Sequence, residues 1–318
     1  MSLGKSPRRG KQKHSNVTGY YQYRDFIHPK YWSTWLGILS LHTIARIPFP
    51  IQKQLAKGLA VLLFRWVKSR KHVALTNIQL CFPELSTEQQ LALTRKTFYS
   101  YTLGLFETAR AWCIQEKGLL YRVEGLEHLR VAEADSRGVL LLSGHYGPLD
   151  IAGVALAQYA KYSITYRNDD NPLFNYFMVK GREKFVDKTI ARQDMRGLLG
   201  AFKRGEIIWY APDQDYGRRA SVFAPFFGIQ TATVTMTGKL ASSGNAIVLP
   251  LSSYRDVDNR TIVLKFEAPL DIPSGDNIAD AHRVNEWLEA SIRRHPDQYL
   301  WLHKRFKTRP EGESSVYK

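Results

Sequence analysis

From about residue 120 onward, short apolar runs alternate with longer stretches of helical periodicity. Short runs rich in branched and aromatic side chains are typical of buried strands. Because parallel strands need a crossover between them, the alternation predicts an α/β fold whose central, mostly parallel sheet is flanked by helices. The expected strands are 138–143, 162–166, 206–210, 246–251 and 261–266, and the expected helices are 149–160, 172–185, 194–204, 232–243 and 277–294.

The residues that precede this region differ from it in composition. Residues 1–30 are rich in lysine and arginine, with Asp25 as their one acidic residue, so we expect a flexible basic arm there. Ser86 and Gln89 have the spacing of a capping box at the start of a long helix. The predicted organisation is a basic arm over 1–30, a membrane-anchoring segment over 31–47 and one large domain over 48–318, helical over 48–116 and α/β over 120–318.

Residues 31–47 form an apolar segment interrupted by a histidine and an arginine. The segment is short for a transmembrane helix, so it can either span a bilayer or lie along its surface. Trp32 and Trp35 suit the headgroup region, and the basic arm favours an anionic surface. The stretch from Leu55 has an apolar body and a basic end, as interfacial helices do. We expect membrane attachment through 31–47; the alternative is that both stretches are core helices.

The chain of 318 residues carries a formal net charge of +16 and is 44% hydrophobic. The hydrophobic content excludes wholesale disorder, and the charge attracts polyanions such as nucleic acid, anionic lipid or an acidic protein. Zinc-ligand spacings, recognition-helix patterns and aromatic RNA-binding signatures do not occur in the sequence. Two cysteines, Cys81 and Cys113, are too few for a disulfide framework. We expect an anionic membrane surface as partner, and neither nucleic acid, metal nor cofactor.

The apolar run Val139–Leu142 leads into the sequence GHYGPLD at 144–150. The carboxyl ends of strands are where α/β proteins place reactive side chains. A histidine whose ring is oriented by an aspartate is a candidate general base. We predict that His145 is a catalytic base supported by Asp150; the alternative is a hydrogen-bonded turn histidine. His128 also has an acid five residues on, but its polar surroundings indicate a surface residue.

Further polar residues follow the predicted elements and are expected to converge on the same crevice. Each taken alone could be an arginine paired with a surface acid or part of a turn. Taken together, they predict a crevice with cationic donors and an aromatic wall. The predicted substrate-binding residues are Arg167, Arg182, Asp213, Gln214, Gly228 and Arg305.

Together these landmarks resemble one family, the lipid A biosynthesis acyltransferases (lauroyl or myristoyl type) of Gram-negative bacteria, within the wider lysophospholipid acyltransferase group. The motifs are NIQLCFPELS at 77–86, GHYGPLD at 144–150, YRNDDNP at 166–172, PDQDYG at 212–217, FAPFFG at 223–228 and WLHKRFKTRP at 301–310. The last three are the most specific, and the similarity runs from about Trp35 to Pro310. One departure is Asp150, because many lipid A members have glutamate there, whereas glycerolipid acyltransferases have aspartate.

The resemblance implies transfer of a fatty acyl chain from an acyl carrier protein thioester to a hydroxyl of a Kdo-bearing lipid A precursor. A hydroxyl needs a base when it attacks, and His145 can take that proton while Asp150 holds the imidazole and stabilises its charged form. No nucleophile-elbow motif occurs, so we expect direct transfer without an acyl-enzyme. Arg167 and Arg182 are candidates to bind a phosphate of the lipid or of the donor's phosphopantetheine.

The same resemblance implies a bacterial inner-membrane enzyme whose catalytic domain faces the cytoplasm. Its expected partners are acidic acyl carrier protein, a membrane lipid acceptor and an anionic membrane surface, and we expect a monomer. Three alternatives remain: an acyltransferase that acts on a glycerophospholipid with acyl carrier protein or acyl-CoA, a basic membrane-surface binding protein with a degenerate site, and a nucleic-acid binder.

Overall fold

A computed structural model describes residues 21–114 and 118–317, so residues 1–20 of the predicted basic arm lie outside the described residues. The end of that arm forms two short 3-10 turns, η2 (Tyr23–Phe26) and η3 (Pro29–Tyr31). Phe26 is buried, and its ring lies 5.9 Å from that of Tyr176. The chain is therefore packed onto the folded domain before residue 31.

The centre of the molecule is a seven-stranded sheet with the strand order β1-β9-β8-β2-β5-β3-β4. Its pairings are parallel except the antiparallel pairing of β8 with β9. The predicted α/β class with a mostly parallel sheet is confirmed. The strands are β1 (Tyr121–Glu124), β2 (Val139–Leu142), β3 (Tyr162–Tyr166), β4 (Thr189–Ala191), β5 (Ile207–Tyr210), β8 (Ile247–Arg255) and β9 (Ile262–Phe266).

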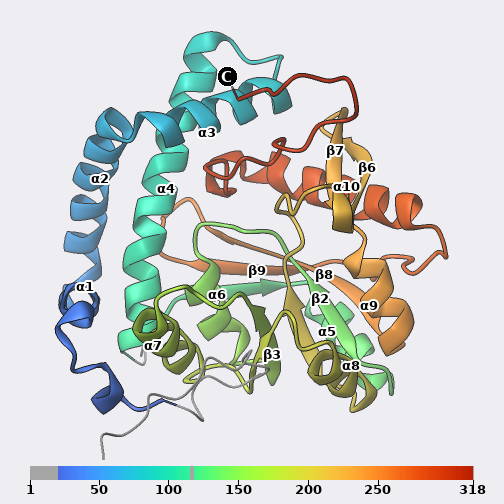
Figure 1. The fold of residues 1–318 in the computed structure, drawn as a ribbon, viewed down its shortest axis with the longest axis horizontal. Coiled ribbons are helices and arrows are strands. Elements are labelled where there is room, and N and C mark those ends of the chain that lie inside the picture. The colour runs from blue at the N-terminus through green and yellow to red at the C-terminus, as the bar shows by residue number, and fades with distance from the viewer. Residues whose placement is uncertain (1–20, 115–117, 318) are drawn as a thin grey trace, which may run out of the picture.

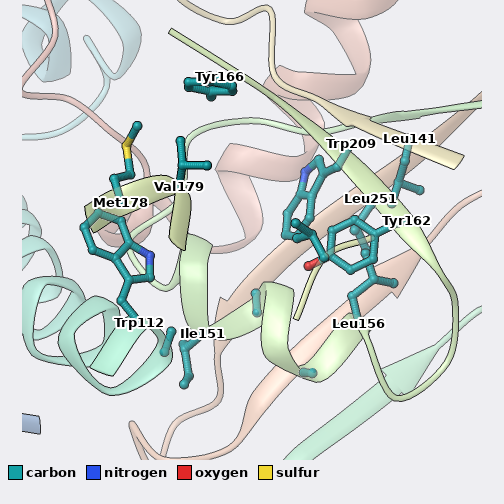
Figure 2. Close-up of a cluster of buried hydrophobic side chains, with 14 of the residues drawn as sticks. Trp112, Leu141, Ile151, Leu156, Tyr162, Tyr166, Met178, Val179, Trp209 and Leu251 are labelled. Atoms are coloured by element: carbon teal, nitrogen blue, oxygen red, sulfur yellow. The ribbon is translucent and has the colours of Figure 1, made fainter. Parts of the chain in front are cut away.

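Helices cover both faces of this sheet, which explains why its central strands are apolar throughout. In β2, Val139 and Leu141 belong to one buried cluster, with α4 (Thr87–Cys113) to α7. Leu140 and Leu142 belong to the other, with α3 (Lys68–Cys81) and α8 to α10. Figure 2 shows part of the first cluster, where Trp209 lies beside Tyr162. The helices after β1 are α5 (Leu126–Ala134), α6 (Leu149–Leu156), α7 (Pro172–Arg182), α8 (Met195–Lys203), α9 (Met236–Gly244) and α10 (Asn277–Arg294).

The N-terminal part is helical, as predicted, and its longest helix begins at the expected capping box. The Ser86 hydroxyl accepts from the Gln89 amide at 3.2 Å, and the Gln89 side chain accepts from the Ser86 amide at 2.8 Å. In Figure 1, α4 lies between the sheet and the outer helices α1 and α2. Within the described residues, no helix has the length and apolar character needed to cross a membrane. The helices are α1 (Trp32–Arg46), α2 (Phe49–Trp66), α3 (Lys68–Cys81) and α4 (Thr87–Cys113).

A buried ion pair connects α4 to the end of β8. The Arg255 guanidinium donates to both carboxylate oxygens of Glu107, at 2.7 and 2.6 Å, and to the Ser100 hydroxyl at 2.8 Å. Breaking such a pair from one side leaves a buried charge and typically costs about 3–5 kcal/mol. The pair therefore fixes the helical layer against the sheet.

Three strand features differ from the prediction. Two of them, β1 and β4, are short edge strands that the apolar pattern did not indicate. The third is a separate hairpin of β6 (Ser221–Phe226) and β7 (Ile229–Val234), and β7 takes the first residues of the helix predicted over 232–243. Its turn places Phe227 and Gly228 at φ of 51° and 74°, a backbone region that favours glycine.

Candidate functional site

A cavity of about 520 Å³ lies at the carboxyl ends of β2, β3 and β5. This is the edge of a parallel sheet at which α/β proteins bind ligands. Much of the wall is apolar: Leu149, Ile164, Phe185, Met195, Leu198, Trp209, Met236 and Leu240. The polar lining includes His145, Asp150, Arg167, Arg182, Arg192, Gln193, Gln214 and Tyr216.

His145 lies in the turn that follows β2, and the backbone of this turn forms hydrogen bonds with two other segments of the chain. The Ser143 amide donates to the Tyr210 carbonyl at 2.9 Å, which continues the pairing of β2 with β5. The His145 carbonyl accepts from the Leu300 amide at 3.0 Å. A Cβ on Gly147 would lie 2.7 Å from the Ser100 hydroxyl oxygen, so a larger residue there would displace the turn. These contacts hold the imidazole at the cavity wall.

The carboxylate of Asp213 binds His145 twice. One oxygen lies 2.5 Å from the ring Nδ1, and the other accepts from the His145 backbone amide at 2.9 Å. Asp213 is only 3% exposed and follows β5, the strand beside β2. With Nδ1 donating to this carboxylate, the neutral ring keeps Nε2 free to accept a proton.

The pair also changes the proton affinity of both groups. Burial lowers the pKa of the His145 imidazole, but the charge and hydrogen bond of Asp213 outweigh this effect and raise it above its ordinary value. Burial raises the pKa of Asp213, yet the charge and hydrogen bonds of His145 outweigh it and lower the pKa to about 2. Asp213 is therefore ionised at neutral pH and stabilises the protonated imidazole.

The predicted partner of the ring was Asp150, and the structure corrects this assignment. Asp150 lies in the first turn of α6 and faces α4 and α7. Its carboxylate accepts from the Arg182 guanidinium at 2.8 and 3.4 Å and from the Thr108 hydroxyl at 3.3 Å. The guanidinium of Arg182 in turn lies 5.4 Å from the centre of the Trp112 ring. Asp150 thus lines the same cavity as His145 but holds an arginine.

The structure brings four of the six predicted substrate-binding residues to this site. Arg167, Arg182 and Gln214 line the cavity, and Asp213 binds His145 directly. Gly228 lies in the turn of the β6–β7 hairpin. Arg305 is 2% exposed and donates to the Ala232 carbonyl at 2.7 Å. These placements do not fit the predicted substrate contacts of Gly228 and Arg305, because the first closes a hairpin and the second is enclosed by protein.

The C-terminal segment that contains Arg305 supports the segment that carries Asp213. The Asp215 carboxylate accepts from the amide and hydroxyl of Thr308, at 2.6 and 2.8 Å. The Asp215 amide donates to Nε2 of His303 at 3.1 Å. Two of the motifs recognised in the sequence are therefore bonded to each other, and their contacts position the acid that holds the His145 ring.

Three of these polar lining residues, Arg192, Gln193 and Tyr216, were not predicted from the sequence. Arg192 follows β4, a strand that was itself not predicted, so no pattern marked the position as a strand end. Tyr216 belongs to the PDQDYG motif but was not singled out within it. Among the residues that the structure describes, no group of three histidine, cysteine, aspartate or glutamate side chains is arranged to hold a metal ion.

Comparison of the amino-acid sequence with known proteins matches the chain to one family. Residues 22–308 match the family described as bacterial lipid A biosynthesis acyltransferase. The chain is 38% identical over 295 residues to the lipid A biosynthesis lauroyltransferase of Escherichia coli (strain K12). The aligned region covers 92% of this chain and 96% of that protein. It is 36% identical to the palmitoleoyltransferase of that strain, over 92% and 97% of the two chains, and 30% identical to the myristoyltransferase, over 93% of each.

Proposed function

The chain belongs to the bacterial lipid A biosynthesis acyltransferases, and we propose that it transfers a fatty acyl chain from an acyl carrier protein thioester to a hydroxyl of a Kdo-bearing lipid A precursor. The observation that carries this proposal is the His145–Asp213 pair on the wall of a largely apolar cavity. A base beside apolar walls suits a reaction in which an alcohol attacks a fatty acyl thioester.

In this reaction, Nε2 of His145 takes the proton of the acceptor hydroxyl as its oxygen attacks the thioester carbonyl carbon. The tetrahedral adduct then collapses: the carbon–sulfur bond breaks, and the imidazolium returns its proton to the leaving thiolate. Asp213 keeps the productive tautomer and stabilises the imidazolium between the two proton transfers. General-base assistance of this kind contributes about 10²–10⁴-fold to the rate.

Arg182 is the group we assign to the oxyanion of that adduct. It lines the cavity with His145, and its charge acts with burial to lower the pKa of His145, against the larger effect of Asp213. Its guanidinium is paired with the Asp150 carboxylate and contacts the Trp112 ring. A preorganised cation where negative charge develops is a large source of rate enhancement. Asp150 is then a positioning residue for Arg182, and its replacement should lower turnover through that arginine.

Direct transfer agrees with the contacts of the His145 ring. A nucleophile activated by histidine lies within hydrogen-bond reach of the ring, as in serine and cysteine acyl-enzymes. The hydrogen-bond partner of the imidazole Nδ1 is the Asp213 carboxylate, and His145 lines the cavity, where we expect Nε2 to meet the acceptor hydroxyl. We therefore propose that the enzyme binds donor and acceptor together in a ternary complex.

We place the enzyme on the cytoplasmic face of the bacterial inner membrane, attached through α1 and α2. Apolar side chains lie exposed along one face of α2, at Ile51, Leu55, Leu59, Leu62 and Trp66, the last being 70% exposed. On α1 the exposed apolar residues are Trp32, Leu36 and Leu39. Amphipathic helices bind a bilayer surface with such a face, and exposed Lys68 and Arg70 after α2 suit anionic headgroups.

A donor and acceptor competition tests the proposed reaction. The purified chain would receive acyl carrier protein thioester or acyl-CoA, each with a Kdo-bearing lipid A precursor or a lysoglycerophospholipid. The proposal predicts the highest kcat/KM for the acyl carrier protein thioester with the lipid A precursor. Faster acylation of the lysoglycerophospholipid, or preference for acyl-CoA, would instead favour a glycerophospholipid acyltransferase. Asp150 matches the motif acid of that class.

A further inference from the structure

The catalytic cavity is lined by two exposed arginines that the proposed mechanism does not use. Arg167 follows β3, and Arg192 follows β4, the neighbouring strand. Their positions are tied together because the Arg192 amide donates to the carbonyl of Tyr166 at 2.9 Å. Both side chains are exposed and both line the cavity that contains His145.

Tyr216 lies with these two arginines. The Arg192 guanidinium carbon is 5.3 Å from the centre of the Tyr216 ring, and the ring is 45% exposed. Burial raises the pKa of the Tyr216 hydroxyl, while the charges of Arg192 and Arg167 act in the opposite direction. The Tyr216 hydroxyl is therefore influenced by the charges of both guanidinium groups, and Tyr216 lines the same cavity as the two arginines.

Three carboxylates, one in the cavity lining and two that each follow one of the arginines by two residues, are engaged elsewhere. Asp150 is paired with Arg182, Asp169 accepts from the Asn171 amide at 2.8 Å, and Asp194 accepts from the Gly197 amide at 3.0 Å at the start of α8. In the described part of the chain, neither Arg167 nor Arg192 forms an ion pair with an acid. Within the described residues, two guanidinium groups in the lining of the cavity thus have no carboxylate as an ion-pair partner.

We propose that Arg167, Arg192 and Tyr216 form a binding subsite for a phosphate group of a substrate. Guanidinium groups bind phosphate oxygens in a bidentate manner, and a phenol can donate a third hydrogen bond. Arg182 is not part of this subsite, because its guanidinium is already paired with Asp150 and is assigned to the oxyanion. The inference rests on the proposed function, in which the candidate phosphates are the phosphodiester of the donor's phosphopantetheine and a phosphate of the lipid acceptor.

The test measures KM for donor and acceptor separately in Arg167→Gln, Arg192→Gln and the double variant. Arg196→Gln is the matched control, because Arg196 is an exposed arginine on α8 that does not line the cavity. A charge-assisted contact to phosphate predicts a rise in KM of about 10- to 100-fold for the substrate that carries it, with a much smaller change in kcat. Arg192→Lys should recover part of the loss, since it keeps the charge but not the bidentate geometry.

Two arms identify which phosphate is bound. In the donor arm, acyl-phosphopantetheine is compared with acyl-pantetheine, which lacks the phosphate; in the acceptor arm, the lipid is compared with its dephosphorylated form. Wild-type preference for the phosphorylated compound in either arm, lost in the double variant, supports the subsite and names its source. KM values for both substrates that match those of Arg196→Gln, or a loss confined to kcat, would overturn it.

A binding measurement separates this inference from the proposed reaction. Equilibrium binding of phosphopantetheine and pantetheine, and of the two forms of the lipid, to the full-length His145→Ala protein needs no turnover. Tighter binding of a phosphorylated form, weakened by Arg192→Gln, supports the subsite even if the assigned transfer reaction were wrong. Equal binding of phosphorylated and unphosphorylated forms in both comparisons would overturn the subsite while leaving the His145 mechanism intact.

Discussion

Replacing Asp213 with asparagine should disable His145 by changing its tautomer. The two oxygens of Asp213 accept from the His145 backbone amide at 2.9 Å and lie 2.5 Å from its Nδ1. Asparagine has one oxygen. If that oxygen keeps the backbone amide, the NH₂ group faces Nδ1, and the ring must carry its proton on Nε2, where it cannot act as a base. A comparable change in a catalytic triad lowers kcat by about 10⁴, and we expect a loss of about 10²–10⁴ here.

The remaining activity of Asp213→Asn should also respond differently to pH. The charge of Asp213 is what raises the pKa of His145 against the lowering effect of burial, so the pKa should fall when that charge is removed. In wild type, activity should rise with pH through this raised pKa, because only the neutral imidazole accepts a proton. The assay is the pH profile of kcat/KM, whose acid limb should move to lower pH in the variant.

Asp150→Asn is the matched control for this prediction. Asp150 also lines the cavity, but its carboxylate binds Arg182 and Thr108. Its replacement should lower kcat and leave the acid limb near its wild-type position. Near-wild-type turnover in Asp213→Asn, or an acid limb that moves in Asp150→Asn but not in Asp213→Asn, would refute this role of Asp213.

Three further perturbations test the other parts of the account. His145→Ala should lower transfer by about 10²–10⁴-fold while the protein stays folded by circular dichroism, and His128→Ala should leave transfer unchanged. Rising salt should weaken the apparent affinity for acyl carrier protein, with little change in turnover at saturating donor, because an acidic carrier would dock on a chain of net charge +16. Leu55→Gln combined with Leu59→Gln on α2 should reduce sedimentation with anionic vesicles, whereas Val131→Gln, an exposed apolar residue on α5, should not.

Each of these predictions has a contradicting result. Normal turnover in His145→Ala would remove the general base from the mechanism. Salt-insensitive use of the carrier thioester would exclude electrostatic docking of the donor. Full sedimentation of the Leu55 and Leu59 variant would assign membrane attachment to another surface of the protein.

The sequence predicted the parts of the fold that local pattern controls. Strands β2 and β5 are buried on both faces, so they appear as apolar runs, and the Ser86 capping box depends on residues only three apart. The short edge strand β1 has no such run, because its residues are exposed or only partly buried. Strand β7 carries threonines and alanine in alternation with few large apolar residues, which is why its end was assigned to the following helix.

For the candidate site, the sequence predicted the positions of the main residues but not which of them pair. His145 was found because it follows an apolar strand, and Asp213 was placed at the same crevice because it follows another. Their pairing joins residues 68 positions apart and depends on β2 lying beside β5, which the order of strands along the chain does not reveal. Asp150 was chosen as the ring partner by proximity in sequence. The start of α6 turns it toward Arg182 instead.

The most direct test of the central claim is the mass of the acceptor lipid after incubation with purified protein and an acyl carrier protein thioester. Wild type and His145→Ala would be compared at equal concentration, with a Kdo-bearing lipid A precursor as acceptor. Wild type is expected to raise the acceptor mass by one acyl group, which equals the mass of the free fatty acid minus one water, and to release the carrier thiol. His145→Ala is expected to add almost none in the same time. Equal acylation by both proteins, or an unchanged acceptor mass with wild type, would contradict it.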